Sequence, residues 1–201
     1  MDNTTPTTRF EISRTPEKLE TYAQRFIDGY ETGEDLYGEA RFVDAMAQRA
    51  SVILDAGCGT GRVAGALTKA GHTAIGVDKS ARLLKVAQKY FPDTAYVETD
   101  LLTVSAELLG NDDFDIIVLP GNVMPCLAEG TERDVLSNLL SLLKPEGRLV
   151  LGFRTDREYA VSQLDEDIVM LGLVEVARFS DWQMGRWYDE SGWIVTVLER
   201  A

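Results

Sequence analysis

Helical and strand-like patterns of apolar residues follow one another along most of the chain, after a first part in which only helical patterns occur. In that first part, Thr15, Pro16 and Glu17 have the features of an N-cap, a first-turn proline and a first-turn acid. Apolar residues then recur at helical spacing as far as Gly33, and a second amphipathic segment covers residues 35–49. Residues 1–14 have no apolar period, so we expect a flexible N-terminus there.

From about residue 50, short apolar runs typical of buried strands alternate with amphipathic helices. The expected strands cover residues 51–56, 73–77, 94–97, 114–119 and 148–153. The expected helices cover residues 62–70, 80–90 and 132–143, and residues 144–147 are expected to form a turn. A helix at about 159–171 then precedes two β-rich runs, 173–179 and 193–199, which suit an antiparallel pair at the sheet edge. This order predicts one α/β domain over residues 15–201, with a doubly wound, mostly parallel sheet and a helical cover from residues 15–49.

Composition narrows the class of partner. The net charge is −13, from 20 basic and 33 acidic residues. Such a chain repels polyanions on average, so neither nucleic acid nor an anionic membrane is an expected partner. The N-terminus has no signal-peptide pattern and no apolar run is long enough to cross a bilayer, which favours a cytoplasmic protein. Cys58 and Cys126 are expected to be reduced thiols, and no cluster with metal-ligand spacing is present in the sequence.

The most informative segment is the glycine turn after the first strand, where Gly57, Gly59 and Gly61 alternate before a helix. Glycine permits positive φ and lets a ligand touch the backbone, and the helix N-terminus offers free N–H groups to an anion. Asp78 ends the second strand 21 residues after Gly57 (78 − 57), close to the spacing of a ribose-binding acid. We therefore expect a nucleoside in this pocket.

The sequence also indicates which nucleoside. A dinucleotide site favours a sixth-position glycine, and Arg62 stands there instead. Asp55, beside the turn, would repel a pyrophosphate but attract an ammonium or sulfonium group. Asp100, after the third strand, is placed to accept a proton from an adenine amino group.

These residues resemble the motifs of class I S-adenosylmethionine (SAM)-dependent methyltransferases. Residues 54–61 resemble the first motif, 76–78 the ribose motif, 99–101 the adenine motif, and 114–119 and 143–150 the motifs of the fourth and fifth strands. The resemblance covers about residues 20–201 and implies a Rossmann-like seven-stranded sheet with an antiparallel last strand. It also implies that SAM is the cofactor and S-adenosylhomocysteine (SAH) the product. The implied cofactor-binding residues are Asp55, Gly57, Cys58, Gly59, Gly61, Arg62, Asp78, Lys79, Asp100, Leu101 and Leu119, with Tyr22 and Arg25 from the leading helix.

Ligands of such sheets bind beyond the carboxyl ends of the strands, so a small-molecule acceptor is expected near residues 120–126. Asn122 is the candidate for orienting it, with Arg154 and Trp182 as further candidates for lining its pocket. Methyl transfer from a sulfonium needs mainly positioning and desolvation, and the sequence shows no clear general base. His72, the single histidine, is expected at the surface in the turn after Gly71. A monomer and a homodimer both fit the sequence.

Three other readings stay open from the sequence. A nucleic-acid methyltransferase would be supported by Pro125 and Cys126, which faintly resemble the nucleophile dipeptide of cytosine-C5 enzymes, and Cys126→Ser would then abolish activity. An NAD-dependent oxidoreductase shares the fold and Asp78. A non-catalytic SAM-binding module would carry the same cofactor motifs, and turnover of SAM would distinguish it from an enzyme.

Overall fold

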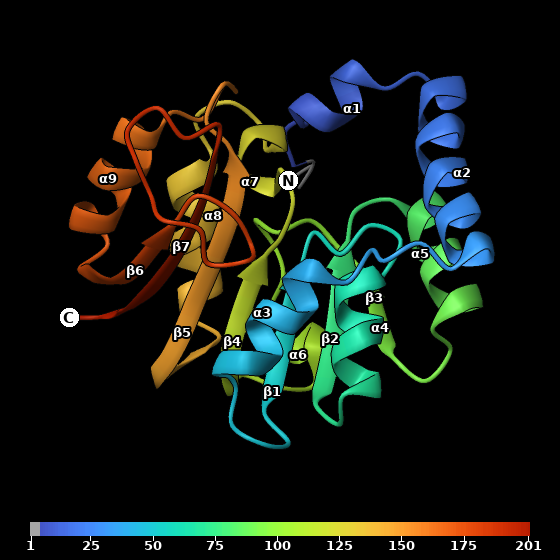
Figure 1. The fold of residues 1–201 in the computed structure, drawn as a ribbon, viewed down its shortest axis with the longest axis horizontal. Helices are drawn as coiled ribbons and strands as arrows, with labels where there is room; N and C mark the ends of the chain where they lie inside the picture. The colour runs from blue at the N-terminus through green and yellow to red at the C-terminus, as the bar shows by residue number, and fades with distance from the viewer. Residues whose placement is uncertain (1–4) are drawn as a thin grey trace.

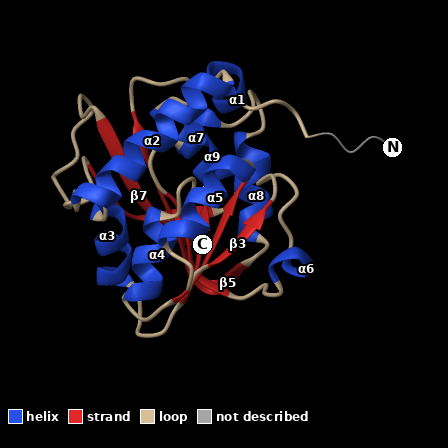
Figure 2. Ribbon diagram, turned by 90° about the vertical axis from the view of Figure 1, so that its right-hand side faces the viewer, coloured by secondary structure: helices blue, strands red, loops and turns tan. Residues whose placement is uncertain are grey.

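The alternating strands and helices fold into one seven-stranded sheet with helices on both faces, in a computed structural model that describes residues 5–201 (Figures 1 and 2). The strands are β1 (Val52–Ala56), β2 (Thr73–Asp78), β3 (Ala95–Glu98), β4 (Phe114–Leu119), β5 (Leu143–Arg154), β6 (Leu173–Phe179) and β7 (Trp193–Arg200). The helices are α1 (Arg9–Ser13), α2 (Pro16–Thr32), α3 (Gly38–Met46), α4 (Arg62–Lys69), α5 (Ala81–Tyr90), α6 (Ala106–Leu109), α7 (Val123–Cys126), α8 (Glu132–Leu140) and α9 (Val161–Met170). The strand order is β3-β2-β1-β4-β5-β7-β6. Only β7 is antiparallel to its neighbours, β5 and β6, which confirms the predicted doubly wound sheet with an antiparallel last strand.

The central strands are apolar on both sides because helices cover both faces of the sheet. Leu54 of β1 lies in a buried cluster with Leu136 of α8. Its neighbour Ile53 points to the other face, where it lies in a cluster with Phe42 of α3 and Leu67 of α4. Since β1 to β5 all run in one direction, their carboxyl ends meet at one edge of the sheet, where the motifs of the sequence come together.

The leading helix α2 has the ends that the sequence predicts. The Thr15 side chain accepts a hydrogen bond from the Lys18 N–H, and Gly33 ends the helix in the left-handed conformation at φ 73°. α2 packs on α5 through a small apolar cluster, and Glu20 forms an ion pair with Arg82 of α5 at 2.6 Å. This contact holds α2 near the carboxyl-end edge of the sheet.

The structure differs from the sequence expectation at residues 9–13, which form α1 rather than a loosely held segment. Thr8 and Glu11 make a capping box, in which each side chain accepts a hydrogen bond from the other residue's N–H. Arg9 then forms an ion pair with the buried Glu132 of α8 at 2.6 Å. Local capping and one long-range ion pair together fix a helix that has no apolar period of its own.

Two further expectations are wrong. Residues 144–147 do not form a turn between a helix and a strand, because α8 already ends at Leu140 and β5 begins at Leu143. The β4–β5 register shifts there, so these residues form an irregularity within β5, where Lys144 forms an ion pair with Asp115 at 2.7 Å. His72 is buried rather than exposed, with its Nε2 3.0 Å from Oδ1 of Asp44 on α3.

The contact between α4 and Phe91 gives a stability prediction. A Cβ atom at Gly65 of α4 would lie 2.2 Å from the buried Phe91 ring. Alanine improves helix propensity by about 1 kcal/mol, but overpacking in a core costs about 1–3 kcal/mol. We therefore expect Gly65→Ala to lower the free energy of unfolding by up to about 2 kcal/mol in urea denaturation.

Gly38→Ala is the matched control for this prediction. Gly38 is also helical, and the nearest atom to its added Cβ would be the end of the Gln183 side chain, at 3.2 Å. That side chain can move, so the expected change is within about 0.5 kcal/mol. A Gly65→Ala protein at least as stable as the wild type would contradict the packing argument.

Candidate functional site

The glycine turn between β1 and α4 has the backbone that its sequence requires. Gly57, Gly59 and Gly61 have φ values of 80°, 54° and 77°, a region that side chains with a Cβ rarely adopt. A Cβ at Gly57 would also lie 2.7 Å from the Val123 side chain, and one at Gly61 would lie 2.5 Å from the Tyr96 hydroxyl. The turn is therefore a narrow cradle that only glycine can build, directly before the N-terminus of α4.

Asp55, the last but one residue of β1, lies beneath this turn and is fully buried. Its Oδ2 accepts a hydrogen bond from the Ala64 N–H at 2.9 Å, whereas its Oδ1 has no hydrogen-bond partner among the described residues. Burial raises the pKa of Asp55 to about 7, which outweighs the opposing effects of the Ala64 hydrogen bond and of Arg62. An unpartnered carboxylate oxygen in such a place is suited to a cationic ligand group.

Asp78, at the end of β2, is fixed by two backbone hydrogen bonds. Its Oδ2 accepts from the Gly59 N–H and its Oδ1 from the Ser80 N–H, both at 2.8 Å. These bonds tie the glycine turn to the start of α5, and burial raises the pKa of the carboxyl group. Each oxygen keeps a lone pair for a ligand hydroxyl, so the geometry suits the predicted ribose contact.

A cavity of about 330 Å³ lies beyond β2 and β3, lined by Thr5, Lys79, Glu98, Thr99, Asp100 and Thr103. The carboxylate of Asp100 accepts from the Leu102 N–H at 2.9 Å and lies 3.0 Å from Lys79 Nζ. Lys79 also pairs with Glu11 of α1 at 3.1 Å, so the N-terminal segment reaches this cavity. Burial opposes ionisation of Asp100, but its hydrogen bonds and Lys79 keep its pKa below the ordinary value.

The remaining predicted cofactor residues with apolar or thiol side chains are buried. Leu101 and Leu119 belong to the large core cluster, and Cys58 lies inside the turn itself. Burial raises the pKa of the Cys58 thiol, and no disulfide joins Cys58 to Cys126. Their packing role is evident in the fold, and their contact with a cofactor stays a prediction.

Tyr22 and Arg62 both lie near the glycine turn, but their partners differ, because Tyr22 packs against an aromatic ring and Arg62 is held by an ion pair. The Tyr22 ring packs against Phe26 at 5.1 Å between ring centroids. Burial raises the pKa of Tyr22, and the charge of Asp78 acts in the same direction, so the two side chains lie within electrostatic reach. The guanidinium of Arg62 is held by Glu39 of α3 and by the Leu36 carbonyl oxygen, so it helps to fix the turn rather than standing free.

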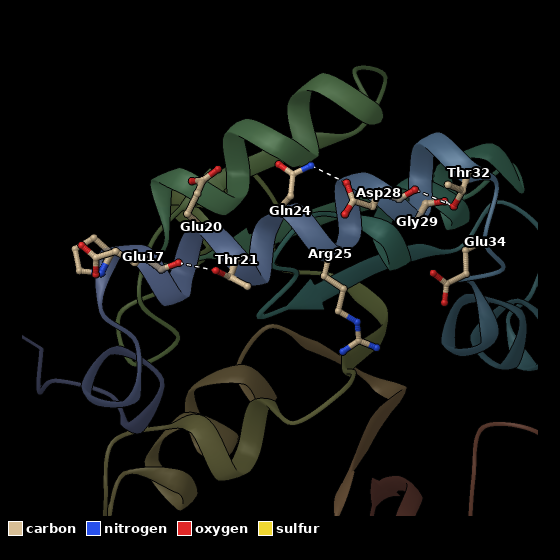
Figure 3. Close-up of a pocket in the computed structure, with 10 residues that line it drawn as sticks. Glu17, Glu20, Thr21, Gln24, Arg25, Asp28, Gly29, Thr32 and Glu34 are labelled. Carbon is tan, nitrogen blue, oxygen red and sulfur yellow. Dashed lines mark hydrogen bonds between the residues drawn. The ribbon is translucent and has the colours of Figure 1, made fainter.

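Arg25 projects from α2 on the side opposite to Glu20 and Gln24 (Figure 3). A wide, shallow hollow runs along this helix and is lined almost entirely by its own polar side chains. It is open to solvent and far from enclosing a ligand, so we place the candidate site at the strand ends instead. Arg25 is exposed and lies 5.9 Å from the centroid of the neighbouring Phe26 ring, and its side chain forms no hydrogen bond or ion pair within residues 5–201.

Of the three predicted acceptor residues, the structure brings two together. Asn122, at the start of α7, accepts a hydrogen bond through Oδ1 from the Arg154 N–H at 2.9 Å. The Arg154 side chain pairs with Asp156 at 2.7 Å. Trp182 instead packs in the core beside Phe42, with ring centroids 5.3 Å apart, on the α3 face of the sheet.

Cys126, at the end of α7, is half-buried, and burial raises the pKa of its thiol. A nucleophilic cysteine needs a lowered pKa, because the thiolate is the reactive form. This environment therefore disfavours the cytosine-C5 type of chemistry.

Sequence reasoning missed Arg14 and Tyr30. The Tyr30 hydroxyl lies 2.8 Å from Thr60 Oγ1 and so ties α2 to the glycine turn. Arg14 stacks on two aromatic rings between α1 and α2. Tyr30 lies on the apolar face of a predicted helix, which was the only available signal, and Arg14 lies in a segment expected to be loosely held.

Taken together, the strand ends suit the cofactor that the sequence predicts. The unpartnered oxygen of Asp55 fits a cation, the glycine cradle fits a group pressed against backbone, and the polar cavity that Lys79 and Asp100 help to line fits a base. Within residues 5–201, the structure shows no group of three His, Cys, Asp or Glu side chains placed to hold a metal ion. In the same residues, none of the helices is both long and apolar enough to cross a membrane.

Comparison with known proteins identifies methyltransferases that are similar to this chain. Residues 53–147 match a family model described as a methyltransferase domain. The crystal structure of a TehB-like SAM-dependent methyltransferase from Corynebacterium glutamicum aligns with a TM-score of 0.85 and 37% identity, over 93% of this chain and 100% of that one.

Two curated relatives match over shorter regions. A putative methyltransferase of Geobacillus sp. (strain WCH70) is 33% identical over 129 residues, which are 61% of this chain and 49% of the relative. Glycine N-methyltransferase of Mus musculus is 31% identical over 116 residues, 51% of this chain and 40% of that protein. The chain therefore spans about half or less of the length of these curated relatives.

Proposed function

Since the chain belongs to the class I SAM-dependent methyltransferases, with SAM as the cofactor of the family, we propose that it transfers a methyl group to a small-molecule acceptor. The observation that supports this most is the arrangement of Asp55 and Asp78. Asp55 is buried and Asp78 half-buried at adjacent strand ends, and each is anchored to the backbone of the glycine turn or of α4. Asp55 would face a cation and Asp78 a ribose, as a nucleoside with a charged tail requires.

The residues of the chain would act mainly by holding and enclosing. SAM supplies a methyl group on a sulfonium, whose leaving group needs no acid. Asp78 would accept hydrogen bonds from the ribose hydroxyls, and Lys79 and Asp100 would border the adenine base. The glycine turn would lie against the amino-acid end of SAM. The acceptor would be held near α7, where Asn122 and the Arg154 backbone are joined. Such positioning, together with the exclusion of water, supplies much of the rate enhancement of a displacement reaction.

A small acceptor is favoured by charge. The net charge of −13 disfavours a polyanion. A cytoplasmic location and a monomeric or dimeric state are parts of the same proposal.

Partition of a radioactive methyl group tests the proposal. The protein is incubated with methyl-labelled SAM and a cell extract, and the products are separated into macromolecules and a small-molecule filtrate. We expect a labelled compound other than SAM in the filtrate, and SAH formation in proportion to it. Label confined to protein or nucleic acid would overturn the small-molecule acceptor. Titration with SAM, SAH and NAD accompanies the assay, and binding of NAD alone would contradict the assignment of the cofactor.

A further inference from the structure

Arg14 has an environment unlike that of the other arginines near the strand ends. It lies between α1 and α2, and its Cζ is 4.7 Å from the centroid of the Phe10 ring and 4.6 Å from that of Tyr22. The two rings pack edge to face, with centroids 5.7 Å apart. The aromatic contacts hold the guanidinium in one orientation, and they leave its hydrogen-bond donors to be satisfied by something else.

No acceptor satisfies all of these donors within the described residues. Arg14 Nε is buried and has no hydrogen-bond partner there, and Arg14 forms no ion pair in that part of the chain. Arg9, only five residues away, shows the ordinary situation, because it pairs with Glu132 at 2.6 Å. A half-buried, oriented guanidinium whose Nε–H is buried without a partner is costly in free energy unless a ligand completes its hydrogen bonds.

Arg14 lies over the site rather than on a remote surface. α1 is anchored on one side by the Arg9–Glu132 ion pair and on the other by the Glu11–Lys79 ion pair. It therefore spans the region between the start of α8 and the end of β2. The charge of Arg14 acts on Tyr22 and on Cys126 of α7. Arg9, Arg157 and Glu158 are the other charged groups that act on Cys126, so cations predominate there.

We propose that Arg14 binds a carboxylate or similar oxyanion of a molecule held at the strand ends, with Phe10 and Tyr22 orienting its guanidinium. The planar fork of a guanidinium matches a carboxylate in two parallel hydrogen bonds. This inference rests on the proposed function, and it assigns an anion contact to Arg14, which is not among the cofactor-binding residues expected from the sequence. The anion has two possible sources, the amino-acid end of the cofactor and a negative group of the acceptor.

Calorimetric titration with SAH and 5′-methylthioadenosine separates these sources, because the second compound lacks the amino-acid end. The variants are Arg14→Met, whose apolar chain still covers the aromatic rings, and Arg14→Lys. Arg49→Gln is the control, since Arg49 is exposed and precedes β1 at the opposite edge of the sheet. Acetate is then titrated into each protein saturated with SAH, as a probe of a second anion site.

If the cofactor supplies the anion, Arg14→Met weakens SAH binding about tenfold or more and leaves 5′-methylthioadenosine binding within about twofold. If the acceptor supplies it, SAH binding is unchanged, and acetate binds the SAH complex of the wild type but not that of Arg14→Met. Either result supports the proposal, and Arg14→Lys is expected to be intermediate. Equal weakening of both nucleosides, or no change in any titration, overturns it. A wild-type protein that binds neither nucleoside would instead refute the proposed function.

Discussion

Replacement of Asp78 by Asn is expected to weaken the binding of SAM and SAH about a hundredfold, or ~2.7 kcal/mol. Asp78 is the single carboxylate at the end of β2, and its two oxygens are already directed by the Gly59 and Ser80 N–H groups. Hydrogen bonds from ribose hydroxyls to an ionised acceptor contribute about 1.5–3 kcal/mol each. Asparagine keeps one acceptor oxygen, but it turns a donor towards the second hydroxyl.

Asp115→Asn is the matched control for Asp78→Asn. Asp115 is also an acid on a central strand, and it also accepts a backbone hydrogen bond, from the Val52 N–H at 2.7 Å, as well as pairing with Lys144. It pairs with the amino end of β1, away from the glycine turn, so its loss is expected to leave SAM affinity within about twofold. Titration calorimetry measures both variants, with urea denaturation as a check on folding. Equal loss of affinity in the two variants would mean that Asp78 acts only through the fold.

The parts of the site that could be predicted from sequence are those fixed by local chemistry. A glycine alternation after an apolar strand can adopt few conformations, so the turn and the position of Asp55 beneath it follow from the sequence. The placement of Asp78 follows in the same way, because parallel strands end at a common edge. The ends of α2 were predictable for a similar reason, since Thr15 and Gly33 act on their own neighbours.

The parts that could not be predicted depend on partners distant in sequence. Arg62 is 23 residues from Glu39, and only the packing of α3 on α4 brings them together. His72 is buried because α3 covers the turn in which it lies. α1 had one local signal, the Thr8–Glu11 capping pair, but its docking depends on Glu132, more than 120 residues away. Arg14 is positioned by that same docking, so its environment was also outside the reach of sequence patterns.

The buried carboxyl group of Asp55 makes a second large effect predictable, a pH dependence of cofactor binding. Burial raises its pKa to about 7, with Asp78 and Glu39 acting in the same direction, and Arg62 and the Ala64 N–H against it. In the ligand-free protein the group is therefore neutral below pH 7 and ionised above it. A cationic ligand group favours the ionised form, so binding below pH 7 must release a proton. Affinity should then rise about tenfold per pH unit up to about pH 7 and level off above it.

Asp55→Asn isolates this effect, because the amide can still accept the Ala64 N–H but cannot ionise. Its affinity for SAM is expected to be nearly independent of pH between pH 5 and pH 7, which calorimetric titration across that range measures. An equal pH dependence for SAM and SAH in the wild type would identify the ammonium as the cation, and a dependence for SAM alone would identify the sulfonium. A wild-type affinity that does not change with pH, or the same slope in Asp55→Asn, would show that Asp55 does not face the cation.

The pH dependence of folding stability is an independent test of Asp55. Its sign is opposite to that of the pH dependence of cofactor binding. A carboxyl group whose pKa is raised in the folded state stabilises that state most below its ordinary pKa of 3.8, and the contribution is lost as the pH rises through about 7. The ligand-free wild type should therefore lose stability relative to Asp55→Asn between about pH 4 and pH 7, with a constant difference above that range. The protein thus accepts a buried group that destabilises it at neutral pH, and the binding of a cation beside Asp55 is the step that would make that arrangement favourable.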